Sequence, residues 1–274
     1  MSSCFIMMSE AMAGPDLPRS PFHGMIDSAA GGKLRALSGD QIERILSEHR
    51  LYLETDRRQG RRADFGSADL SGLNFSGLNL RRAKMDHALL NGADFTGANL
   101  QRANFIGAIL PHARLDDADL SSARLSGANL VSASLRDACL ARADMEFALA
   151  ANAVLAGASL ESADMSGAIL DASVLTGANL RAVNLRGAGF RAARLDGADL
   201  RGARLGGAFL VDASLRGADL RGAYLRLAKL EGADLSGADL SDAEGLTRAQ
   251  LAAAQCDGET RMPAALSEAD DGEG

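Results

Sequence analysis

A five-residue period that runs without interruption from Ala63 to Ala243 is the feature that most restricts how this chain can fold. With the exception of position 150, a large apolar residue occupies position 65 and every fifth position up to 240, and in most pentads a small residue lies two places before it. An α-helix repeats near 3.6 residues and an exposed strand near 2.0, so neither fits a strict period of five. The chain must therefore turn once in every pentad.

Within each pentad, the central residue and the residue two before it have the same parity. On a short extended segment both side chains then point inward, and the other three point outward. Alanine usually occupies the position two places before the large residue, which is expected for a narrow column with room for one large and one small side chain per side. Asp or Asn often precedes the centre, and Gly recurs two places after it, which suits a turn at every corner.

Pentads such as Ala-Asp-Leu-Arg-Gly at 218–222 and Ala-Asp-Leu-Ser-Gly at 233–237 resemble the A(D/N)LXX motif of the pentapeptide-repeat family, known from bacteria. The resemblance covers residues 63–243. It implies an all-β solenoid, a right-handed quadrilateral β-helix with four pentads per coil and about nine coils. At about 4.8 Å between neighbouring strands, this column would be about 43 Å long.

A coil of 20 residues would stack outward residues that lie 20 apart into ladders. Residues of opposite charge fall on one such side, namely Asp199, Asp219 and Asp239 with Arg181, Arg201 and Arg221. Like charges stacked at this spacing repel unless opposite charges lie between them. We therefore expect Asp and Arg to alternate on this side and to neutralise one another.

A few pentads depart from the pattern. Leu73 and Leu78 replace the small residue in the first coil, where a wider cross-section could meet a cap. Ala150 occupies a central position that elsewhere holds Leu, Phe or Met. A buried void there would cost about 1–3 kcal/mol, so we expect a local irregularity around Ala150 or an inward rotation of Leu149.

The segments that flank the repeat predict caps for the two ends of the column. Ser38 and Gln41 form a capping box, and apolar residues follow at helical spacing, which predicts an N-terminal capping helix at about 39–54 within the lead-in 34–62. Thr247 and Gln250 predict a short C-terminal helix at about 248–255 within 244–266. Residues 1–33 and the acidic tail 267–274 lack periodicity, so we expect them to be disordered.

The composition indicates a protein of the cytoplasm. Its three cysteines, Cys4, Cys139 and Cys256, are scattered and give no disulfide framework, which favours a reducing compartment. The N-terminus lacks the pattern of a signal peptide, and no segment approaches the roughly 18 apolar residues of a membrane-spanning helix. We expect no membrane association.

The repeat offers no site for catalysis. A column filled with Leu and Ala has no concave pocket with convergent polar groups. His23, His49, His87 and His112 lack metal-ligand spacing. We therefore predict no enzyme activity, cofactor, metal or small-molecule substrate. The chain also lacks a basic, aromatic-lined face, so we expect no direct binding to nucleic acid.

Apolar residues at outward positions of one predicted side are the strongest local indication of function. They are Leu89, Ile109, Val131, Leu149, Ile169, Phe209 and Val211. Contiguous exposed apolar surface usually marks an interface, so these residues predict contact with a protein partner or with a second copy of the chain. The sequence leaves two alternatives open, which are cover by the chain's own helix or tail, and no role.

An alternative function comes from the family resemblance. Some bacterial pentapeptide-repeat proteins that protect against quinolones bind DNA gyrase by imitating duplex DNA. Duplex DNA carries one negative charge per about 1.7 Å, so a mimic of this length would present on the order of 25 negative charges. Residues 63–243 hold 18 basic and 21 acidic side chains, and this balance makes the mimic the second choice behind a protein-interaction scaffold.

Overall fold

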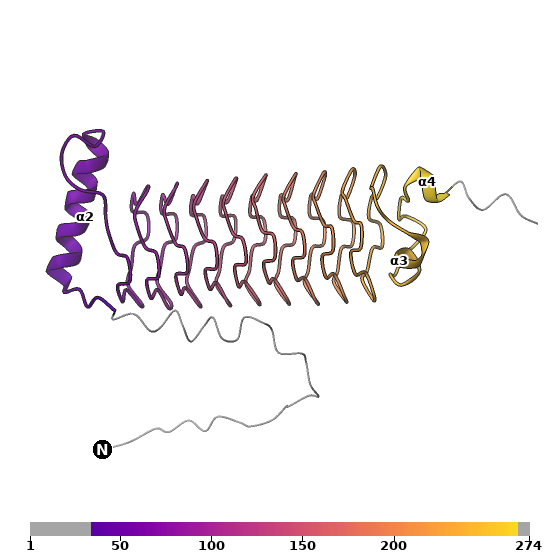
Figure 1. The fold of residues 1–274 in the computed structure, drawn as a ribbon, viewed down its shortest axis with the longest axis horizontal. Helices are drawn as coiled ribbons and strands as arrows, with labels where there is room; N and C mark the ends of the chain where they lie inside the picture. The colour runs from indigo at the N-terminus through magenta and orange to yellow at the C-terminus, as the bar shows by residue number, and fades with distance from the viewer. Residues whose placement is uncertain (1–33, 268–274) are drawn as a thin grey trace, which may run out of the picture. The chain divides into compact units, whose positions relative to one another are not determined.

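A computed structural model describes residues 34–267, which consist of a column of stacked five-residue units between helical ends (Figure 1). The helices are α2 (Gly39–Glu54), α3 (Arg248–Ala252) and α4 (Ala264–Ser267). The extended segments between α2 and α3 are short, and each contributes a single bridging residue to a parallel ladder. Residues 1–33 and 268–274, for which we expected disorder, lie outside the described part, whereas Ser267, which we also placed in the disordered tail, is the last residue of α4. No helix within residues 34–267 is long and apolar enough to cross a membrane.

The bridges fix the register of the column. Along the repeat each bridge joins residues 20 apart, from Asp64 with Lys84 to Tyr224 with Glu244. Since each pentad makes one turn, each coil has four pentads and four sides, as the resemblance implied. We name the sides A, B, C and D after their first bridging residues, which are Asp64, Asp69, Asn74 and Asn79; each side continues in steps of 20.

Backbone hydrogen bonds explain why these residues form such units, as the pentad 118–122 illustrates. Its first N–H closes the preceding turn, its second donates to the coil before, and its third and fifth donate to the coil after. The remaining N–H, of Ser121, donates to Asp119 Oδ1 at 3.0 Å. All five donors are therefore satisfied, and the Asp or Asn of the motif serves as acceptor for the one N–H that the ladders leave over.

The corners have the backbone geometry that the recurring glycines predicted. The residue two places after each central residue has positive φ, from Ser67 to Asp242, whether or not it is glycine. A type II turn requires this conformation at its third residue. Other residues adopt it at a cost of roughly 1–2 kcal/mol, and here they include Phe147 at 55° and Leu227 at 62°.

The core follows the predicted parity. Every central side chain from Phe65 to Leu240 is buried, and so is nearly every small residue two places before it. Leu73 packs against the core from a partly buried position. Leu78 was expected to point inward but is 36% exposed, and it lines a groove beside α2 with Leu46 and Leu53.

The irregularity that we expected around Ala150 is absent, so that prediction was wrong. The Ala150 N–H donates to the Ile169 carbonyl at 2.7 Å, and the Leu149 N–H donates to the Ala128 carbonyl at 2.9 Å. Ala150 is buried, and Leu149 keeps its outward bridging position. The inter-coil hydrogen bonds hold the backbone in register even where the central side chain is small.

The N-terminal helix confirms the prediction from its capping box. Ser38 Oγ accepts from the Gln41 N–H, the Gln41 side chain accepts from the Ser38 N–H, and α2 follows over Gly39–Glu54. Ile42, Ile45 and Leu46 pack against the core. The helix therefore covers the first coil.

His49 attaches this helix to the repeat. Its side chain is buried, its ring stacks on Tyr52, and its Nδ1 accepts a hydrogen bond from the Ala63 N–H at 3.0 Å. Ala63 is the first residue of the first pentad, so the imidazole joins the cap directly to the beginning of the column.

The C-terminal end differs from the prediction in the length of its helix. The capping box of Thr247 and Gln250 is present, but α3 ends at Ala252 and not at 255. Gln255 instead forms a bridge with Asp234, so the chain returns to the ladder. Arg261 bridges Asp239 in the same way, and α4, which we did not predict, follows at Ala264–Ser267.

Replacing Ala150 with Leu should stabilise the column. The regular backbone gives this position the same surroundings as the other central positions, which hold larger side chains. We expect Ala150→Leu to raise the free energy of unfolding by about 1–3 kcal/mol by filling space in the core. Urea unfolding measures this change, with Leu130→Ala on the same side as the reverse control, expected to cost about 2–5 kcal/mol. A less stable Ala150→Leu variant would contradict the expectation.

Acidification should loosen the N-terminal cap. Burial and the nearby Arg62 lower the pKa of His49 below its ordinary value of 6.5. His49 therefore binds a proton more readily in the unfolded cap than in the folded cap. The stability of the folded cap is complete above pH 6.5 and falls as the pH drops from 6.5 through the lower pKa that His49 has in the folded state. Amide exchange in α2 should accelerate between pH 7 and pH 5 beyond the intrinsic change. His49→Gln should lack this added acceleration; an unchanged profile would contradict the role of His49.

Candidate protein interaction surface

Side B carries the apolar residues predicted to form an interface. Its bridged ladder consists of Asp69, Leu89, Ile109, Asn129, Leu149, Ile169, Gly189, Phe209 and Lys229. Val131 and Val211 follow the buried central residues of the same side. The structure thus brings together all seven predicted residues, which we call the apolar stripe. Most of them are half-buried, and Phe209 is 40% exposed.

The stripe extends over most of the column and has two interruptions. From Leu89 to Phe209 it covers six inter-coil steps, or about 29 Å at about 4.8 Å per step. Asn129 and Gly189 interrupt it, and the Asn129 Oδ1 already accepts a hydrogen bond from the Val131 N–H at 3.1 Å. The polar interruption is therefore partly satisfied within the chain.

Phe147 widens the stripe at the corner between sides A and B, and sequence reasoning did not identify it. The side chain is 52% exposed, and its φ of 55° is unusual for an aromatic residue. Its ring lies over Gly167, where an added Cβ would come within 2.5 Å of it. A bulky residue at a corner position that is usually Gly or small is the signal that could have revealed it.

Charged side chains lie in the C-terminal half of side B. The Arg191 guanidinium lies 5.6 Å from the centre of the Phe209 ring, within the range of a cation–π contact. The Arg191 N–H donates to Asp171 Oδ1 at 2.9 Å. The two ends of the ladder are also charged, with Asp69 at one end and Lys229 at the other.

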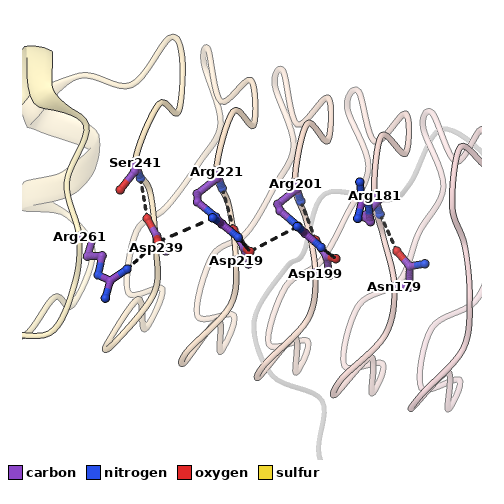
Figure 2. Close-up of polar contacts among 9 residues, drawn as sticks. All are labelled: Asn179, Arg181, Asp199, Arg201, Asp219, Arg221, Asp239, Ser241 and Arg261. Atoms are coloured by element: carbon purple, nitrogen blue, oxygen red, sulfur yellow. Dashed lines mark hydrogen bonds and ion pairs between the residues drawn. The ribbon is translucent and has the colours of Figure 1, made fainter.

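Side D carries alternating charges, as Figure 2 shows. Arg201 binds Asp199 of its own coil at 2.5 Å and approaches Asp219 of the next coil at 3.4 Å. Arg221 repeats the arrangement with Asp219 at 2.6 Å and Asp239 at 4.0 Å. The predicted alternation is confirmed, and this side presents no block of one charge.

The two ends of this charged ladder differ. Arg261, in the segment after α3, extends it by binding Asp239 at 3.2 Å. At the other end the Arg181 N–H donates to Asn179 at 3.2 Å, and among residues 34–267 no ion pair joins the Arg181 side chain. The ion pairs therefore begin at Asp199 and include the C-terminal segment, which sequence reasoning did not foresee.

Other candidate groups remain separate from the stripe. Cys139 lies half-buried on side D with its Sγ 3.1 Å from Ser121 Oγ. His49 belongs to the cap, whereas His87 and His112 occupy corners. Among residues 34–267 no group of three or more His, Cys, Asp or Glu could hold a metal ion.

The 20-residue register, the buried central residues and the Asp or Asn acceptors agree with a family comparison. A family model described as pentapeptide repeats matches residues 61–97, 98–137, 138–177, 173–210 and 208–244. The chain belongs to the pentapeptide repeat family. None of the curated proteins matches this pentapeptide repeat protein.

Solved structures include several similar pentapeptide repeat proteins. HetL, involved in heterocyst differentiation regulation in the cyanobacterium Nostoc sp. strain PCC 7120, is 28% identical, with 82% of this chain and 94% of HetL covered and a TM-score of 0.40. AT2G44920 from the Arabidopsis thaliana thylakoid lumen is 36% identical over 43% of this chain and 68% of its own, with a TM-score of 0.30. Full-length QnrB1, a plasmid-mediated fluoroquinolone resistance protein, is 20% identical, with 75% of this chain and 94% of QnrB1 covered and a TM-score of 0.38.

Asp219 should stabilise the fold more by accepting a backbone hydrogen bond than by carrying a negative charge. Asp219 Oδ1 accepts from the Arg221 N–H at 3.2 Å, and hydrogen bonds from Arg221 hold the pKa of Asp219 below its ordinary value. Asp219→Asn keeps the acceptor and should cost less than about 1 kcal/mol, whereas Asp219→Ala should cost about 1–2 kcal/mol. Urea unfolding of both variants measures the difference, and equal losses would contradict this account.

Proposed function

We propose that this pentapeptide repeat protein is a non-enzymatic interaction scaffold that binds a protein through the apolar stripe on side B. In this proposal the column is a right-handed β-helix of about nine coils, and it acts in the cytoplasm without a cofactor. The observation that carries the proposal is the alignment of seven outward apolar side chains on one side. An exposed apolar surface, even one with two interruptions, usually marks an interface when its residues align on one side.

The described helices leave this surface accessible. Apolar residues of α2 and α3 pack against the core, and Figure 1 shows α2 at one end of the column and α3 and α4 at the other. Cover by a helix of the described part, which was one of the alternatives, is therefore not supported. The backbone ladders also hold the stripe rigid, so binding would cost little conformational entropy.

Imitation of DNA receives less support from the charges of the column. Within the repeat, 18 basic side chains nearly balance 21 acidic ones. On side D the aspartates are paired with Arg201 and Arg221, which reduces the negative potential that a gyrase-like partner would recognise. An inhibitor or protector of gyrase remains the alternative, and a supercoiling assay with added protein tests it.

Aspartate substitutions in the stripe should abolish association. A double variant, Ile109→Asp with Ile169→Asp, places two charges in the centre of the stripe, where desolvation would oppose binding. Both positions are outward and half-buried, so the column should stay folded. The measurement is recovery of cross-linked partners by mass spectrometry, together with self-association by sedimentation.

Side C offers a matched control. Val154 and Val174 are bridged, half-buried and outward, as the stripe residues are. Val154→Asp with Val174→Asp should therefore leave association unchanged. If the two double variants lose association equally, or if wild type associates with nothing, the proposed function is wrong.

A further inference from the structure

We infer that the apolar stripe binds a second copy of this chain, antiparallel and with a two-fold axis that passes at Leu149. The inference rests on the proposed function, because it uses the same surface, and it adds the identity and the orientation of the partner. An isologous contact of this kind requires a surface complementary to itself when it is reversed end to end. The bridged ladder of side B has this property at its two ends.

The charges at the ends of side B show the complementarity. Leu149 is the middle of the bridged ladder, with Asp69 four bridges before it and Lys229 four bridges after it. The two-fold axis passes at Leu149 and runs across side B, perpendicular to the length of the column. Rotation about it brings Asp69 of each copy opposite Lys229 of the other, so the dimer contains this pair at both ends. A parallel arrangement in register would instead oppose like charges at both ends, which is unfavourable.

The sizes of the residues between the two ends also match in the antiparallel arrangement. Leu89 lies opposite Phe209, and Leu149 lies opposite itself. Ile109 lies opposite Gly189, which has no side chain and is flanked by the Asp171 carboxylate, whose Oδ1 lies 3.0 Å from the place that a Gly189 Cβ would take. Asn129 lies opposite Ile169, and its Oδ1 keeps its own hydrogen bond from the Val131 N–H.

Phe147 gives the strongest local argument for contact at the axis. Phe147 lies at the corner of the coil that contains Leu149, and rotation about an axis across side B does not exchange the two edges of that side. Phe147 of one copy therefore meets Phe147 of the other. The ring is half-exposed and supported by Gly167 beneath it, on a backbone with positive φ. Exposed aromatic residues are typical of interface contacts, and two such rings can stack across the axis.

The size of the surface predicts the strength of the dimer. The ladder from Asp69 to Lys229 covers about 38 Å at about 4.8 Å per step, and a three-residue segment is about 10 Å wide. Each copy then contributes on the order of 400 Å² before the corner side chains are added, about half of a standard interface of about 800 Å² per partner. We expect a reversible dimer that forms at micromolar or higher concentration.

Cysteine cross-linking tests the position of the axis. In the full chain with Cys4, Cys139 and Cys256 changed to Ser, Leu149→Cys should form covalent dimers with a short bismaleimide, because the axis places the two thiols opposite each other. Leu89→Cys alone should not, because Leu89 of the other copy lies six coil steps away across the axis. A mixture of Leu89→Cys chains and Phe209→Cys chains should cross-link. Thermal unfolding verifies that each variant folds.

Reversal of the end charges gives an independent test by sedimentation. Asp69→Lys should weaken the dimer by placing like charges at both ends, and the double variant Asp69→Lys with Lys229→Asp should restore it. The Ser71 N–H donates a hydrogen bond to Asp69 Oδ1, and Asp69→Lys removes this acceptor. Since the double variant also lacks the acceptor, a restored dimer shows that loss of this hydrogen bond does not weaken the dimer.

The outcomes separate this inference from the proposed function. Equal cross-linking of Leu89→Cys and Leu149→Cys indicates a parallel dimer and overturns the antiparallel arrangement, while the stripe remains an interface. A wild-type chain that sediments as a monomer up to several hundred micromolar overturns the dimer altogether. In that case the proposed function is still tested by whether the double variant Ile109→Asp with Ile169→Asp loses a different protein partner that the wild type recovers.

Discussion

Hydrogen bonding between successive coils is the interaction on which the rest of this structure depends. In an interior pentad such as 118–122, three of the five backbone N–H groups donate to a neighbouring coil, so such a coil does not satisfy its own backbone and requires its neighbours. The same bonds force central side chains inward and bury them at 2% exposure or less. They also place outward residues about 4.8 Å from their equivalents in adjacent coils. The surface of the protein therefore consists of rows of outward side chains, each row formed by residues 20 apart in the sequence.

Much of the fold was predictable because local and global patterns agree. The period of five fixed the inward residues, and the 20-residue step fixed which outward residues share a side. Both capping boxes predicted where α2 and α3 begin, since they act through local hydrogen bonds. The end of α3 was not predictable in this way, because Gln255 leaves the helix to bridge Asp234, a contact between distant positions. Ala150 illustrates the same limit, since backbone bonds to neighbouring coils override the preference of one small side chain.

The candidate surface was predictable to a similar degree. The seven residues of the apolar stripe follow from register alone, and the structure places them on side B. Phe147 was missed because the turn position carries no inward or outward parity, and its exposure depends on how the ring lies over Gly167. The role of His49 was also hidden, since its spacing suggested an ordinary core position of the helix. Its bond to the Ala63 N–H depends on how the cap meets the first coil.

The four-sided register has a consequence for how such a chain can change in length. Inserting or deleting one pentad would leave the core pattern intact but rotate every later coil by a quarter turn. Leu149 and Ile169 would then no longer share a side with Leu89 and Ile109, although each pentad would still fold. Only whole coils of 20 residues can be gained or lost without dividing the surface, so duplications that preserve binding should occur in that unit.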